Sequence, residues 1–178
     1  MDTFIKKMSK AIDVLEKTEI VIGCFTLCLF VLMVTYQVVA RFLAVSAYFT
    51  EEISTTAFIW TAFMGSSVML RRYEHYRFTG VAEKLKGKAF LINEFICLII
   101  LLIVSILMSV HGVRLAIMFS TWRFSSLKIS RTWLWICLPI SGITSTIYVV
   151  EAIIKFIHDP STRAVKSEAD RLLEEADV

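Results

Sequence analysis

The chain has 178 residues, of which 57% are hydrophobic and only 20% are charged, and its net charge is +3. The mean hydropathy is +0.69, whereas an ordinary soluble domain is about 45–50% apolar and about 25% charged. Because the apolar excess lies in long runs, the composition argues against a soluble globular enzyme and against a disordered chain. The small net charge gives no reason to expect a nucleic-acid partner.

Four charge-free runs are long enough to cross a bilayer as helices, which takes about 17–25 residues each. They cover residues 20–40, 53–70, 95–113 and 133–150. The runs are apolar on all sides, whereas a barrel strand is shorter and alternates in polarity. The sequence therefore predicts an all-α, polytopic membrane protein whose four-helix transmembrane domain covers residues 20–158.

Basic residues predict the orientation of these helices, because cytoplasmic segments of membrane proteins are enriched in Lys and Arg. Fourteen of the 19 Lys and Arg residues lie in segments 1–19, 71–94 and 151–178. The other five lie in loops 41–52 and 114–132. We therefore expect both termini to be cytoplasmic and these two loops to face outward.

The two ends of the chain differ in character. Residues 1–19 form an amphipathic helical pattern, with one apolar side (Phe4, Ile5, Met8, Ala11, Ile12 and Leu15) and one charged side (Lys6, Lys7, Lys10, Asp13 and Lys17). This pattern predicts a helix lying on the inner membrane surface with its lysines near anionic lipid. The alternative is a solvated extension of the first span. Residues 159–178 are mostly polar and are predicted to form a cytoplasmic tail.

Ionisable groups at membrane depth mark transport paths, because they are costly there. None of the four runs contains an Asp, Glu, Lys or Arg, and Glu94, Arg114 and Glu151 fall at run ends, where long side chains reach the interface. No spacing of Ser, His, Cys or carboxylates specifies catalysis or a metal site. We therefore expect no enzyme activity, no metal and no cofactor. The uncharged polar residues, such as Gln37, Ser141 and Thr144, are assigned to helix packing, with a permeation path as the alternative.

Two patterns concern helix packing. Ala57, Thr61 and Gly65 recur every fourth residue, and small residues at that spacing let two helices approach closely. Pro139 removes one backbone hydrogen bond and is predicted to kink the fourth helix, with Gly142 adding slack.

The charged motifs at the span boundaries resemble a known family. In order, they are Arg41-Phe42, Glu51-Glu52, Leu70-Arg71-Arg72 with Glu74-His75, Ile129-Ser130-Arg131-Thr132-Trp133 and Leu138-Pro139. Taken together over residues 20–150, these motifs resemble the small membrane subunit (DctQ type) of tripartite ATP-independent periplasmic (TRAP) transporters. No single motif is decisive, and the specificity lies in the ordered set.

The resemblance implies a partner and a task. It implies a large polytopic membrane subunit that carries the substrate and sodium sites, and a periplasmic substrate-binding protein that delivers an organic acid of the sialic acid or C4-dicarboxylate class. The small subunit would be a non-conducting scaffold in the bacterial inner membrane. Sodium is then expected in the large subunit and not in this chain.

The resemblance also gives candidate contact residues. Arg41, Glu51 and Glu52 bracket the outer loop 41–52, where they are expected to pair with each other or to contact a partner. A local alternative is that Glu51 and Glu52 stabilise a helix N-terminus capped by Thr50. At the inner end, Arg71, Arg72 and His75 are expected to contact the large subunit or lipid headgroups, and the same contact is assigned to Ala57, Thr61 and Gly65.

Loop 114–132 is an exception to the enrichment of basic residues in cytoplasmic segments. It is predicted to face outward, yet it carries four basic residues and no acidic one. The basic residues are Arg114, Arg123, Lys128 and Arg131. Such a surface attracts an acidic patch on a soluble partner, and we predict that it helps to dock the binding protein. The alternative is a short interfacial helix whose cations reach the headgroups.

Two other functions stay open at the level of sequence. One is a self-contained oligomeric four-helix carrier or channel lined by Gln37 and hydroxyl groups. The other is a membrane redox protein that uses Cys24, Cys28 or His111. Uptake by this chain alone would support the first, and a visible spectrum would support the second.

Overall fold

The computed structural model describes residues 2–72 and 88–158, with side chains for residues 8–72 and 91–157. The described helices are α1 (Asp2–Phe42), α2 (Tyr48–Arg71), α4 (Lys88–Met118), α5 (Thr132–Trp135) and α6 (Cys137–His158). The four predicted spans are confirmed as helices long and apolar enough to cross a membrane, and the fourth combines α5 with α6. The predicted tail 159–178 and His75 lie outside the described residues.

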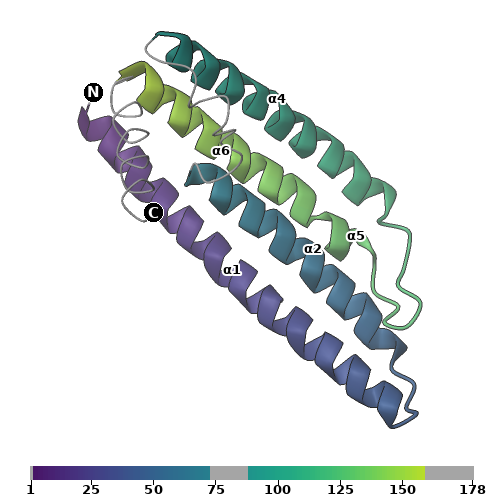
Figure 1. Ribbon diagram of the computed structural model, residues 1–178. Coiled ribbons are helices and arrows are strands. Elements are labelled where there is room, and N and C mark those ends of the chain that lie inside the picture. The colour runs from purple at the N-terminus through teal and green to yellow at the C-terminus, as the bar shows by residue number, and fades with distance from the viewer. Residues whose placement is uncertain (1, 73–87, 159–178) are drawn as a thin grey trace, which may run out of the picture.

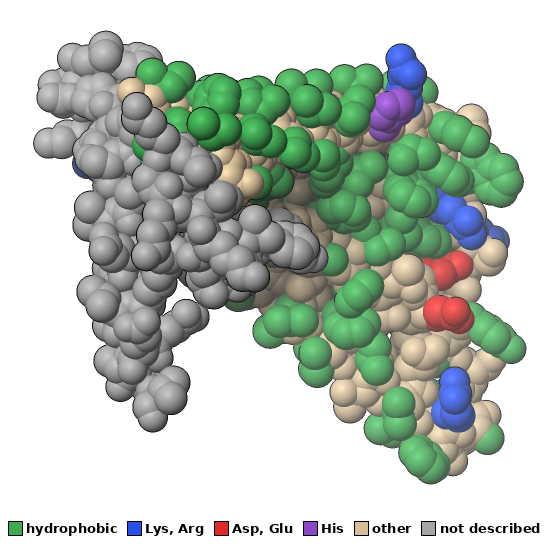
Figure 2. Space-filling model, turned by 45° about the horizontal axis from the view of Figure 1, so that its top comes forward, with side chains coloured by type: hydrophobic (Ala, Val, Ile, Leu, Met, Phe, Trp, Pro, Cys, Tyr) green, Lys and Arg blue, Asp and Glu red, His purple; other side chains and the backbone are tan. Residues whose placement is uncertain are grey.

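The long helices lie side by side in the order α1, α2, α6, α4 (Figure 1). Helix α2 packs between α1 and α6, and α6 packs between α2 and α4. This arrangement is a single layer rather than a closed bundle, so the central helices contain the best-buried side chains, such as Tyr148 and Val149. Large apolar side chains stay exposed on the outer helices, for example Phe25 on α1 and Ile103 on α4. In Figure 2, hydrophobic side chains cover much of the visible surface.

Helices α4 and α6 approach each other most closely at two glycines. A Cβ atom on Gly112 would lie 2.7 Å from the backbone nitrogen of Pro139, and a Cβ atom on Gly142 would lie 2.7 Å from the backbone nitrogen of Ser109. Both distances are shorter than any ordinary carbon contact, so only glycine fits at either position. Gly142 was predicted only to add flexibility beside Pro139, and its close packing against α4 was not predicted.

The fourth span is interrupted at Ile136, between α5 and α6. Pro139 has no N–H to donate to the carbonyl of Trp135, so the regular helical ladder cannot continue through this point. Pro139 itself lies in the first turn of α6, where a missing donor is tolerated. The predicted irregularity is therefore confirmed, and it falls three residues before the proline.

Helix α1 runs without interruption from Asp2, so the boundary predicted at residue 19 is not a break in the structure. A separate helix is absent from the described residues at this end, and the first turns extend the first span. Ser9 donates a hydrogen bond to Glu151 of α6, and Glu19 accepts one from Tyr148 of α6, so this extension is bound to the other helices.

The three small residues of α2 do not share one environment. Ala57 is buried, the hydroxyl of Thr61 lies 2.8 Å from that of Thr26 on α1, and a Cβ on Gly65 would meet nothing within 4 Å. Gly65 therefore lies at an open surface, where its predicted contact with a large subunit or lipid is untested. On the other side of α2, Ser141 of α6 donates to the carbonyl of Phe63 at 2.8 Å.

Candidate functional site

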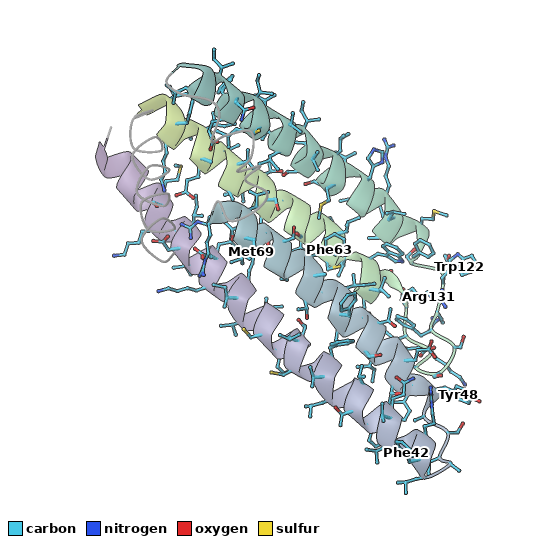
Figure 3. The ribbon with its side chains drawn as sticks, viewed as in Figure 1. Phe42, Tyr48, Phe63, Met69, Trp122 and Arg131 are labelled. Carbon is cyan, nitrogen blue, oxygen red and sulfur yellow. The ribbon has the colours of Figure 1, made fainter. Side chains whose placement is uncertain are left out.

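Polar side chains gather at the two ends of the layer. One group, which we call the polar cluster, lies at the end that holds the N-terminus, and it consists of Ser9, Asp13, Glu16, Glu19, Arg71, Arg72, Tyr148, Glu151 and Lys155. The other end, which we call the loop end, holds loop 43–47, loop 119–131 and the first turns of α2. Figure 3 labels Phe42, Tyr48, Trp122 and Arg131 at the loop end.

Arg71 lies at the centre of the polar cluster and joins three helices. Its guanidinium pairs with Asp13 and Glu16 on α1, and its Nε lies 3.4 Å from Glu151 Oε2 on α6. The Arg71 side chain is only 11% exposed. Since an arginine presents a rigid fork of five donors, one side chain can hold several carboxylates in a fixed arrangement. Arg71 thus uses its donors within the chain, which leaves few for the predicted external contact.

Other members of the cluster complete the connection between α1 and α6. Ser9 donates to Glu151 Oε1 at 2.9 Å, and Lys155 Nζ lies 2.6 Å from the same oxygen. The hydroxyl of Tyr148 donates to Glu19 Oε2 at 2.6 Å. These contacts surround a cavity of about 240 Å³. Side-chain contacts therefore fix the N-terminal turns of α1 to α6.

Glu151 lies near the end of its span, as predicted, but its side chain does not reach the interface as the long side chains at span ends were expected to do. Its side chain is only 4% exposed, because partners from α1 and α2 surround it. A signal for the cluster was present in the spacing. Ser9, Asp13 and Glu16 share one face of α1, and Tyr148, Glu151 and Lys155 share one face of α6 at helical spacing. The amphipathic pattern of residues 1–19 included Asp13 on its charged side but left out Ser9 and Glu16.

Glu52 connects helix α2 to loop 119–131 at the loop end. Its carboxylate accepts hydrogen bonds from the backbone N–H of Ser126, at 2.9 Å and 3.2 Å, and of Leu127, at 3.0 Å. A carboxylate bound by backbone donors makes a charge-assisted hydrogen bond, which is stronger than a neutral one. Glu52 therefore holds a loop that is 74 residues away in the chain.

Two expected contacts of this end do not form. In the described part of the chain, no ion pair joins Arg41 to Glu51 or to Glu52. Thr50 is not the cap of α2 either, because the capping position is Ala47, and Thr50 Oγ1 donates to the Ala47 carbonyl at 2.6 Å. Arg41 and Glu51 instead line a cavity of about 270 Å³ near Gln37.

In segment 114–132, residues 114–118 are the last residues of α4, and loop 119–131 is shaped by backbone pairing and not by a helix. The segment is therefore not one separate interfacial helix. Arg123 and Ser130 form an antiparallel bridge, and Arg123 Nη1 donates to the carbonyl of Lys128 at 3.0 Å. Lys128 has a φ of 55°, in the left-handed region. Arg123 and Lys128 are exposed, as is Arg114 at the end of α4. The structure thus exposes three of the four predicted basic residues at the loop end.

We expect Glu52→Gln to loosen loop 119–131. The amide side chain keeps the shape but loses the charge, which weakens bonds worth about 1.5–3 kcal/mol for a charged partner. Amide hydrogen exchange at Ser126 and Leu127 should then accelerate by about tenfold or more. Glu51→Gln is the matched control. It removes the same charge one residue away but leaves intact the hydrogen bonds from Ser126 and Leu127 to Glu52. Equal exchange in the two variants would contradict the role of Glu52.

The comparison with known families now decides the identity. The sequence profile of the DctQ component of tripartite ATP-independent periplasmic transporters matches residues 30–158. The chain belongs to the DctQ family. The match covers α2, α4, α5, α6 and the last third of α1, and it confirms the resemblance found in the boundary motifs. No curated protein sequence matches the chain.

As a DctQ-family chain, the protein is a component of a transporter that has other subunits, and not a member of an enzyme family. Its four apolar helices fit a multi-pass inner-membrane protein. Cys24 and Cys28 lie at the exposed surface of α1, and His111 is exposed on α4. Within residues 2–72 and 88–158, no group of three His, Cys, Asp or Glu residues is arranged to hold a metal ion.

Proposed function

We propose that this DctQ-family chain is the non-conducting scaffold of a sodium-coupled TRAP symporter that takes up an organic acid of the sialic acid or C4-dicarboxylate class. In this proposal the large membrane subunit binds the substrate and the sodium ions, and this chain fixes that subunit in the membrane. The polar cluster faces the cytoplasm with both termini, and the loop end faces the periplasm.

The single-layer arrangement is the observation that supports a scaffold. Large apolar side chains are exposed on all four long helices of the layer, while the ion pairs and the Glu52 contacts lie at its two ends. A carrier needs a path lined by polar groups through its middle. The hydroxyls of the middle are instead engaged with backbone carbonyls, as for Ser141 with Phe63 and Thr146 with Gly142. These features favour a scaffold over the self-contained carrier or channel.

Co-purification tests the scaffold proposal. The chain is expressed with the proteins encoded beside it and isolated in mild detergent through a tag on this chain. We expect a much larger polytopic protein to be recovered in stoichiometric amount. Recovery of this chain alone as a homogeneous oligomer, with transport in vesicles that contain no other protein, would contradict the proposal.

Part of the proposal is that the basic loop end helps to dock the periplasmic binding protein. We expect the double reversal Arg123→Glu with Lys128→Glu to slow association of that protein by about tenfold at low salt, because both exposed cations contribute to long-range attraction. The salt dependence of the rate should flatten as well. Stopped-flow association with the assembled transporter measures both.

The control for docking is Lys10→Glu, which changes an exposed lysine at the opposite end of the layer. It alters the net charge in the same direction as one of the two reversals but leaves the loop end intact. If Lys10→Glu slows association as strongly as the double reversal, the attraction is a property of the net charge and the loop is not the docking surface.

A further inference from the structure

A cavity of about 690 Å³ lies at the loop end, between the first turns of α2 and the connection from α4 to α5. Such a volume is within the range of about 300–1,000 Å³ typical of small-ligand sites. Its walls combine aromatic side chains with charged ones, among them Tyr48, Phe124, Trp135, Glu51, Glu52 and Arg131.

Arg131 supplies to this cavity a cation with one unpaired donor. Its Nε is shut off from solvent and has no hydrogen-bond partner in the described part of the chain. The guanidinium lies over the ring of Phe124, with 5.7 Å from Cζ to the ring centroid, which positions it without satisfying its donors. A buried donor without a partner costs about 1–3 kcal/mol. The orphan donor therefore points to an anionic group as the missing partner.

Glu51 supplies an unused anion to the same cavity. It is exposed, and among the described residues no cation lies within ion-pair distance of its carboxylate, Arg131 included. The neighbouring Glu52 is occupied by the N–H groups of Ser126 and Leu127, so its charge is already engaged. Among the described residues, the cavity thus offers an arginine with an unpaired donor and a carboxylate without an ion pair, and the two do not pair with each other. That combination is complementary to a ligand that carries both charges.

We propose that this cavity binds the headgroup of a zwitterionic phospholipid, phosphatidylethanolamine. Arg131 binds the phosphate, since a guanidinium fork matches its oxygens, and Glu51 accepts hydrogen bonds from the ammonium group. The position of the cavity argues for a lipid over a free small molecule. It lies where two candidate membrane spans begin, at Tyr48 and at Thr132. Tyr48 and Trp135 in its walls belong to the residue types that gather at membrane interfaces.

The test measures lipid binding by the full chain. The protein is delipidated in detergent and titrated with phosphatidylethanolamine, phosphatidylcholine or phosphatidylglycerol, and bound lipid is counted by native mass spectrometry. Phosphatidylcholine has no N–H donor for Glu51, and phosphatidylglycerol has no cation. We expect phosphatidylethanolamine to bind about tenfold more tightly than either, the gain of one charge-assisted hydrogen bond.

Variants assign the two groups separately. Glu51→Gln should abolish the preference for phosphatidylethanolamine over the other two lipids, and Arg131→Gln should weaken all three because each carries a phosphate. Arg114→Gln is the control, because Arg114 is an exposed cation outside the cavity. If Arg131→Gln fails to fold, the exposed position of Glu51 keeps the test intact.

Two outcomes would overturn the proposal. Equal binding of the three lipids, or binding unchanged by Glu51→Gln, would remove the headgroup site. Displacement of the lipid by equimolar glycerophosphoethanolamine would show that the acyl chains contribute nothing, so the site would belong to a soluble zwitterion and not to a membrane lipid. None of these readouts depends on the large subunit or on the binding protein, so failure here leaves the scaffold proposal untouched.

Discussion

Replacement of Arg71 by methionine is expected to destabilise the helix layer by about 3–5 kcal/mol, the cost of removing one partner from a buried charge cluster. The guanidinium is only 11% exposed and holds carboxylates from both α1 and α6. Without it, Glu151, whose side chain is 4% exposed, retains only Lys155 as a cation among the described residues. Burial of carboxylates with too few partners is unfavourable. Thermal unfolding of the purified full chain measures the loss.

Arg72→Met is the matched control for this experiment. Arg72 follows Arg71 directly and pairs with Glu16, but its side chain is 50% exposed. An ion pair in contact with solvent is worth about 0–1 kcal/mol, so the control should unfold close to the native chain. Equal destabilisation by the two substitutions would mean that net charge, and not the buried position of Arg71, stabilises this end.

The second large effect concerns two glycines, at which substitution by alanine should change the stability in opposite directions. Gly142→Ala places a methyl group 2.7 Å from the backbone nitrogen and hydroxyl of Ser109, and we expect it to cost about 1–3 kcal/mol by forcing α4 away from α6. Gly65→Ala adds a methyl group where nothing lies within 4 Å. Since alanine is a better helix former than glycine by about 1 kcal/mol, this variant should be as stable as the native chain or slightly more stable.

Thermal unfolding of both glycine variants gives the comparison, and a cysteine pair placed across α4 and α6 reports the separation of the helices directly. If Gly142→Ala and Gly65→Ala destabilise the chain equally, the close contact between α4 and α6 at Gly142 is not what makes glycine necessary there. Gly65→Leu adds information about a partner. If Gly65 contacts the large subunit, the bulky side chain should reduce co-purification while the isolated chain stays folded.

The number and type of helices could be predicted from the sequence, because the thickness of a bilayer sets a length that the four charge-free runs meet. Their order in space could not be predicted. All four runs are apolar on every side, so no stripe of hydrophobic residues indicates which face meets a neighbour. The close approach at Gly112 and Gly142 depends on that order, whereas the regular spacing of Ala57, Thr61 and Gly65 does not lead to one shared contact.

The polar ends were predicted in part. The boundary motifs drew attention to Glu52 and Arg71 as contacts with other subunits, whereas the contacts that the structure shows for both lie within this chain. These partners are distant in sequence, and Ser126 contributes only its backbone N–H, which any residue except proline would supply. The contact of Glu151 with Ser9 joins residues 142 positions apart. Rules based on local spacing relate residues within one helix, so they indicate a polar face but not the helix that it meets.

The helix order has a consequence for the synthesis of the protein in the cell. Helix α6, the last of the described helices to leave the ribosome, lies between α2 and α4 and is the main neighbour of α4 within the described residues. Until α6 enters the membrane, α4 lacks this neighbour, and Arg71 lacks its contact with Glu151. A chain that stops before Cys137 should therefore expose α4 as an unassembled helix, which membrane quality-control proteases recognise and remove.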